Sequence, residues 1–138
     1  MSAFADQLAA VPLFSACSRR DLQRLAGAAD EVVVGAGTEL TVEGAVGREM
    51  FVLLEGNVEI RKGGTVEIEL GPGDHFGELA LLDGGPRTAT VVTSTDATLL
   101  VLTKPAFHAV LDEIPTLAHK LLVSLARRLR ASERSFGH

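Results

Sequence analysis

The sequence predicts a mainly β protein: an antiparallel eight-stranded β-roll, similar to a jelly roll, with helices at both ends. Between residues 31 and 102, short apolar runs with a period of two alternate with turns rich in glycine. These connections are too short to contain crossover helices, so neighbouring strands must run antiparallel. On both sides of this stretch, apolar residues recur at helical spacing.

Composition indicates one folded domain over residues 1–138, with 46% hydrophobic residues. The net charge of -5 argues against a protein that holds nucleic acid through its phosphates. Cys17 is the single cysteine, so no internal disulfide can form, which suits a reducing cytoplasm. We expect a cytoplasmic protein without membrane association, because no apolar run reaches transmembrane length and the N-terminus does not resemble a signal peptide.

Residues 1–30 are expected to form two helices. The first covers residues 2–10, and the chain breaks near Pro12. The second helix starts at Ser18, where Asp21 completes a variant of the capping box. Its apolar face consists of four residues at helical spacing: Leu22, Leu25, Ala26 and Ala29.

Residues 31–102 form the predicted roll. The apolar run 50–54 is continuous, which indicates a strand buried on both faces. Gly63 and Gly64 predict a hairpin turn. In the strand after this turn, the alternating apolar side chains are expected to point inward: Val66, Ile68 and Leu70. Further strands are expected at 32–34, 40–42, 58–61, 90–93 and 98–102.

Residues 103–133 are expected to form two more helices. Thr103 is a plausible N-cap and Pro105 suits the first turn. The second helix runs from Pro115 to about Ser132. It carries a stripe of leucines: Leu117, Leu121, Leu122, Leu125 and Leu129. Its arginines are expected to be solvated: Arg127, Arg128 and Arg130.

Residues 76–91 contain the groups that point to a function. A short helix that starts near Glu78 has unpaired N–H groups at its N-terminus, which attract an anion. Gly77 lacks a Cβ, so a ligand can approach the backbone there. Arg87 supplies a planar set of donors suited to phosphate. Glu78 would repel an anion, so we expect it to accept a hydrogen bond from a hydroxyl of the same ligand, which suggests a nucleotide.

The stretches Phe76-Gly77-Glu78-Leu79-Ala80-Leu81 and Pro86-Arg87-Thr88-Ala89-Thr90-Val91 together resemble the phosphate-binding cassette of the cyclic nucleotide-binding domain family. That family includes catabolite activator proteins, regulatory subunits of cyclic-nucleotide-dependent kinases and cyclic-nucleotide-gated channels. The resemblance covers residues 11–133. It implies that ligand-binding residues are Phe76, Gly77, Glu78, Leu79, Ala80, Pro86, Arg87, Thr88 and Ala89.

The resemblance also implies roles for these residues. The backbone at Gly77, Leu79 and Ala80 and the Arg87 side chain would hold the cyclic phosphate. Glu78 would bind the ribose 2′-hydroxyl. Thr88 would influence the choice between cAMP and cGMP, with cAMP expected first. The helices of residues 103–133 would act as hinge and lid.

The sequence therefore predicts a stand-alone sensor of cyclic nucleotide that is not an enzyme and needs no metal or cofactor. Its partner would be an effector protein or a second copy, bound through the C-terminal helix. The chain stops at His138, so no DNA-binding module is expected.

Two alternatives stay open. One is an interaction module that kept the fold and lost the ligand, which the presence of Glu78 and Arg87 argues against. The other is a metal-dependent, cupin-like enzyme, which needs clustered histidines. His75 is the one histidine among the predicted strands, and it is interpreted as structural or solvated.

Overall fold

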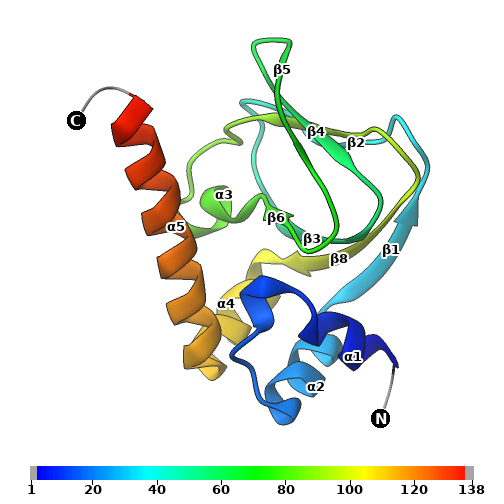
Figure 1. The fold of residues 1–138 in the computed structure, drawn as a ribbon, viewed down its shortest axis with the longest axis vertical. Helices are drawn as coiled ribbons and strands as arrows, with labels where there is room; N and C mark the ends of the chain where they lie inside the picture. Colours follow the sequence, from blue (N-terminus) through cyan, green and yellow to red (C-terminus); the bar gives the residue numbers. More distant parts are fainter. Residues whose placement is uncertain (1–2, 136–138) are drawn as a thin grey trace.

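Two four-stranded antiparallel sheets form the centre of the molecule, and helices cover one side of them (Figure 1). The computed structural model describes the backbone of residues 3–135 and the side chains of residues 4–132. One sheet has the order β1-β8-β3-β6 and the other β2-β7-β4-β5. The strands are β1 Asp30–Val34, β2 Glu39–Thr41, β3 Glu49–Glu55, β4 Val58–Lys62, β5 Thr65–Leu70, β6 His75–Phe76, β7 Thr90–Thr93 and β8 Ala97–Thr103. The predicted eight-stranded antiparallel roll is confirmed.

Among the described residues, three helices precede the roll, one lies between its strands, and two follow it. The helices are α1 Ala3–Ala9, the 3-10 helix η1 Pro12–Phe14, α2 Arg19–Ala28, α3 Glu78–Asp83, α4 Lys104–Glu113 and α5 Pro115–Ser135. The expected first helix, 2–10, is found as α1, and its first residue lies outside the described part. The capping box is present, because Ser18 accepts from the Asp21 backbone and Asp21 accepts from the Ser18 backbone.

Strand β3 separates two hydrophobic cores. Met50, Val52 and Leu54 pack with the helices, on the outer face of their sheet. Phe51 and Leu53 point the other way and pack between the two sheets. Because side chains alternate along a strand, a strand between two cores must be apolar at every position. This explains the continuous apolar run, and the prediction for residues 50–54 is confirmed.

Strand β5 differs from its prediction. The side chains of Val66 and Ile68 were expected to be buried, but they are 48% and 54% exposed. Strand β5 is at the edge of its sheet and pairs with β4 alone, so its surroundings are open on one side. Val42, just beyond β2, is also exposed, at 46%.

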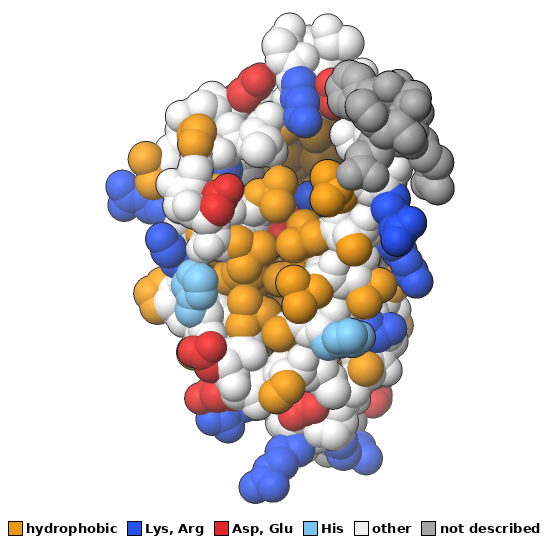
Figure 2. Space-filling view, turned by 90° about the vertical axis from the view of Figure 1, so that its left-hand side faces the viewer, with side chains coloured by type: hydrophobic (Ala, Val, Ile, Leu, Met, Phe, Trp, Pro, Cys, Tyr) orange, Lys and Arg blue, Asp and Glu red, His pale blue; other side chains and the backbone are white. Residues whose placement is uncertain are grey.

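Helix α5 has one packed face and one exposed face. It begins directly after Ile114, which is buried and ends α4. Leu117 and Leu121 are buried against the helical core, whereas Leu122 and Leu129 are exposed. Figure 2 looks at the side of the molecule where α5 lies and shows hydrophobic side chains spread over this surface. No helix among the described residues is long and apolar enough to cross a membrane.

Candidate functional site

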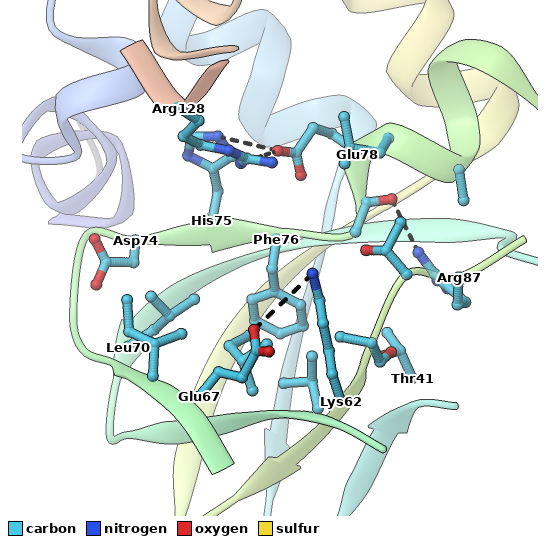
Figure 3. Close-up of a pocket in the computed structure, with 18 of the residues that line it drawn as sticks. Thr41, Lys62, Glu67, Leu70, Asp74, His75, Phe76, Glu78, Arg87 and Arg128 are labelled. Carbon is cyan, nitrogen blue, oxygen red and sulfur yellow. Dashed lines mark hydrogen bonds and ion pairs between the residues drawn. The ribbon is translucent and has the colours of Figure 1, made fainter. Parts of the chain in front are cut away.

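A cavity of about 510 Å³ lies between the roll, helix α3 and the C-terminal part of α5 (Figure 3). Three walls enclose it. The cassette forms the first wall, strands and the β4–β5 hairpin form the second, and α5 supplies the third through Ser124 and Arg128. Outside the cassette, the lining residues of the roll include Thr41, Ile60, Lys62, Glu67, Ile68, Leu70 and His75.

The structure brings nearly all the predicted site residues together around this cavity. Phe76, Gly77, Glu78, Leu79, Ala80, Arg87, Thr88 and Ala89 all line it. Pro86 does not. It pairs with Val46 in an isolated β-bridge and faces a second, more open hollow beside the first.

Gly77 and helix α3 fit together tightly. Gly77 caps α3 with a φ of 89°, a left-handed conformation that favours glycine. A Cβ on Gly77 would lie 2.8 Å from Arg87 Nη1 and 3.2 Å from the Glu49 carbonyl oxygen. The glycine is therefore required both by the backbone angle and by the close approach of Arg87.

Arg87 is buried, with 6% of its surface exposed, and the backbone holds its side chain. Nη1 donates to the Gly77 carbonyl at 2.9 Å, and Nη2 donates to the Glu49 carbonyl at 2.7 Å. These bonds use two of the five guanidinium N–H groups. Burial lowers the pKa of Arg87, an effect opposed by the carboxylates of Glu49 and Glu78, and an arginine remains a cation throughout. The result is a fixed positive charge at the cavity wall.

Gly47 is a part of this site that the sequence reading missed. From the sequence alone, residues 44–47 are expected to form a turn. A Cβ on Gly47 would lie 2.5 Å from the Ala80 Cβ and 3.1 Å from the Arg87 guanidinium. The loop around it also fixes the backbone of Arg87, whose N–H donates to the Ala45 carbonyl at 2.8 Å. No sequence signal separates Gly47 from an ordinary turn glycine.

Glu78 is the most deeply buried acid of the site, with 1% of its surface exposed. Arg128 of α5 donates from Nη1 to Glu78 Oε1 at 2.6 Å. The expectation that Arg128 is merely solvated is therefore wrong: about half of its side chain is buried, and its guanidinium pairs with the buried acid. Three arginines lie close together near the end of α5: Arg127, Arg128 and Arg130. The sequence did not show which of them reaches the cavity.

His75 also lines the cavity, next to Glu78. Its side chain is 13% exposed, and its Nε2 is 3.7 Å from Glu78 Oε1. Burial has the largest effect on the pKa of His75 and lowers it. Of the smaller charge effects, Glu78 raises the pKa, Arg128 lowers it and Asp74 raises it, and the net pKa is below the usual value. His75 is not solvated, as its 13% exposure shows, and it lines the candidate site.

Comparison with known proteins identifies the family. The family model described as "Cyclic nucleotide-binding domain" matches residues 31–113. The chain belongs to this family. A cyclic nucleotide-gated potassium channel of Rhizobium etli is 36% identical to this cyclic nucleotide-binding domain over 114 residues, which are 83% of this chain and 32% of the channel. A cAMP-dependent protein kinase regulatory subunit of Schizosaccharomyces pombe is 35% identical over 102 residues, 73% of this chain and 25% of the subunit.

Solved structures share the fold of this cyclic nucleotide-binding domain. The catabolite activator protein of Thermus thermophilus superposes with a TM-score of 0.84 and 30% identity, over 91% of this chain and 62% of that one. The N-terminal domain of a Streptomyces coelicolor transcriptional regulator gives 0.74 and 34% identity, with 95% of each chain covered. The domain therefore spans a third or less of the channel and the kinase subunit, and most of the Thermus protein's length.

Proposed function

We propose that this protein binds a 3′,5′-cyclic nucleotide, cAMP or cGMP, in the 510 Å³ cavity and acts as a sensor of that nucleotide. The observation that carries the proposal is a buried cation and a buried acid on one cavity: Arg87 and Glu78. A cyclic nucleotide has one anionic phosphate and one free ribose hydroxyl, which match these two groups. A related structure, the regulatory domain of a Toxoplasma gondii kinase, was solved with cAMP and is 33% identical.

The phosphate is assigned to the cassette. Arg87 keeps guanidinium donors beyond the two that bond to the Gly77 and Glu49 carbonyls, and a phosphate oxygen accepts such bonds well. Because the guanidinium is already held in place, little conformational entropy is lost when the ligand arrives. The surrounding contacts come from the remaining predicted residues: Phe76, Gly77, Leu79, Ala80, Pro86, Thr88 and Ala89.

The ribose 2′-hydroxyl is assigned to Glu78. An ionised carboxylate has about four acceptor sites, and the bond from Arg128 uses one of them. A hydroxyl donor from the ligand can therefore join without displacing Arg128. This arrangement supports a role for Glu78 as a link between ligand and helix α5.

We propose that helix α5 moves when the ligand binds and transmits the signal, with α4 as its hinge. Together, residues 103–133 form one functional segment of a single domain. The break at Ile114 and Pro115 gives a pivot, and Arg128 and Ser124 reach the ligand cavity from the lid. A ligand moves an equilibrium only if it binds one state better, and contact with these residues supplies that difference. The exposed Leu122 and Leu129 then offer a surface to an effector protein or a second copy in the cytoplasm.

A thermal-shift and calorimetric screen tests this function. The purified chain is titrated with cAMP, cGMP and, as a linear control, 5′-AMP. Ligand at about 100 times its dissociation constant should add roughly 2.7 kcal/mol to the free energy of unfolding. We expect this for a cyclic nucleotide and not for 5′-AMP. No stabilisation by either cyclic nucleotide would contradict the proposal and favour an interaction module that has lost its ligand.

A further inference from the structure

His75 has an unsatisfied ring nitrogen. Among the buried side-chain nitrogen and oxygen atoms of the described residues, its Nε2 is the one without a hydrogen-bond partner. Glu78 Oε1 is 3.7 Å away, too far for a hydrogen bond. Burying a polar atom without a partner costs about 1–3 kcal/mol, so native proteins rarely leave one unexplained.

The surroundings of His75 suggest what is missing. Strand β6 places His75 and Phe76 on opposite faces, and Figure 3 shows His75 on the side of Glu78 and Arg128. Nε2 and Glu78 Oε1 are 3.7 Å apart, and an oxygen about 2.8 Å from both can lie to one side of the line that joins them. His75 lines the cavity in which the ligand is proposed to bind.

We infer that His75 is a further binding residue of the site and that its Nε2–H donates a hydrogen bond to the ribose 2′-hydroxyl held by Glu78. This inference rests on the proposed function. A hydroxyl has one hydrogen to donate and two lone pairs that accept. Glu78 takes the hydrogen but, as a carboxylate, cannot serve the lone pairs. His75 supplies a donor for one of them, and the hydroxyl gives the buried nitrogen its partner.

The charged groups around the ring are compatible with this role. Glu78 and Arg128 face it from α3 and α5, and Asp74 is its neighbour in the chain. The pKa of His75 lies below its usual value, so the ring is neutral at pH 7 and carries one N–H. The carboxylate of Glu78 favours the tautomer with this hydrogen on Nε2, toward the cavity.

The test compares cAMP with 2′-deoxy-cAMP in calorimetric titrations of four proteins: wild type, His75→Phe, His75→Gln and, as a matched control, His119→Gln at an exposed position of α5. The measured quantity is the ratio of the two dissociation constants. We expect wild type and the control to share a high ratio. His75→Phe should lower it about five- to tenfold, because the hydroxyl loses one hydrogen bond. His75→Gln should keep part of the wild-type ratio, since the glutamine amide can donate a hydrogen bond to the hydroxyl.

Each outcome that contradicts the inference or the proposed function gives a different result in these titrations. An unchanged ratio in His75→Phe, with cAMP still bound, overturns this inference and leaves nucleotide binding intact. Equal binding of both ligands by wild type overturns the hydroxyl roles of His75 and Glu78 together. Absence of any binding by wild type overturns the proposed function itself. Thermal unfolding of each variant without ligand verifies the fold, and the glutamine variant gives a second reading if the phenylalanine variant is unstable.

Discussion

The cassette and the lid face the same cavity but are built differently. In the cassette, Arg87 is 6% exposed and bonded to two backbone carbonyls, and Gly77 and Gly47 pack against it. In the lid, the recorded hydrogen bond between α5 and the cassette is that of Arg128 to Glu78, and about half of the Arg128 side chain is exposed. The cassette wall is held by backbone hydrogen bonds and steric fit. The end of α5, beyond its packed Leu117 and Leu121, is tied to the cassette by one ion pair.

This difference suggests that the cassette and α5 have different functions. The proposed phosphate subsite is fixed before the ligand arrives, which favours affinity because little ordering is needed on binding. The C-terminal part of α5, beyond the packed Leu117 and Leu121, is tied to the cassette through one side chain and can change position at low cost. Substitutions in the cassette should therefore change affinity strongly, whereas substitutions in the lid should change mainly the behaviour of α5.

The largest effect is expected for Arg87→Ala. Removing the cation leaves the bound phosphate without its main partner, a loss of about 2–5 kcal/mol in binding free energy. The dissociation constant for cAMP should rise roughly 30- to 5,000-fold in calorimetry. Arg20→Ala, at an exposed position of α2, is the control and should bind like wild type. Near-normal binding by Arg87→Ala would refute the assignment of the phosphate.

Gly47→Ala should weaken binding without removing any polar group. The new Cβ would lie 2.5 Å from the Ala80 Cβ, so α3 or the Arg87 side chain must shift. Overpacking of this kind costs about 1–3 kcal/mol, which we expect to appear in both stability and affinity. Gly27→Ala on α2 has nothing within 4 Å of its Cβ and should leave binding unchanged. Equal affinity for all three proteins would show that the cassette is less rigid than proposed.

Arg128→Ala tests the lid. The change removes a half-exposed charged hydrogen bond of about 1 kcal/mol, so cAMP affinity should fall by roughly fivefold or less. The clearer effect should be faster amide hydrogen exchange in α5 of the free protein. Arg127→Ala, one residue earlier and exposed, is the matched control. If α5 exchanges at the same rate in both variants and in wild type, Arg128 does not hold the lid.

The smallest effect is expected for Thr88→Ala. Thr88 is exposed and lines the cavity, so its hydroxyl can reach the base of a bound nucleotide. A single neutral hydrogen bond contributes about 1 kcal/mol, and its loss should weaken cGMP roughly fivefold while cAMP changes less. An equal loss for both nucleotides in parallel titrations would refute a role in choosing the base.

The sequence predicted the parts of the molecule that depend on local rules. The continuous run of β3, the hairpin at Gly63 and Gly64, the Ser18 cap and the break before Pro115 all depend on neighbours in the chain. The grouping of the cassette residues around one cavity was predictable for a related reason. The residues expected to bind phosphate are all contained in residues 76–91, with a fixed spacing.

The features that the sequence did not predict depend on contacts between segments that are distant in the chain. Arg128 and Glu78 are 50 residues apart, and an arginine near a helix end gives no indication of a buried partner. Gly47 matters because Arg87 packs on it, and His75 because Glu78 faces it. The exposure of Val66 and Ile68 depended on β5 lying at the sheet edge, which alternation along one strand cannot show.

Hydrogen exchange with and without saturating cAMP tests the central claim most directly, because it reads both walls in one experiment. We predict that α5 and the hinge helix α4 change their exchange on binding, that the cassette around α3 becomes more protected, and that β3 between its two cores stays as it is. The same exchange in α4 and α5 in both states, with binding verified by calorimetry, would contradict the account and show a static binder.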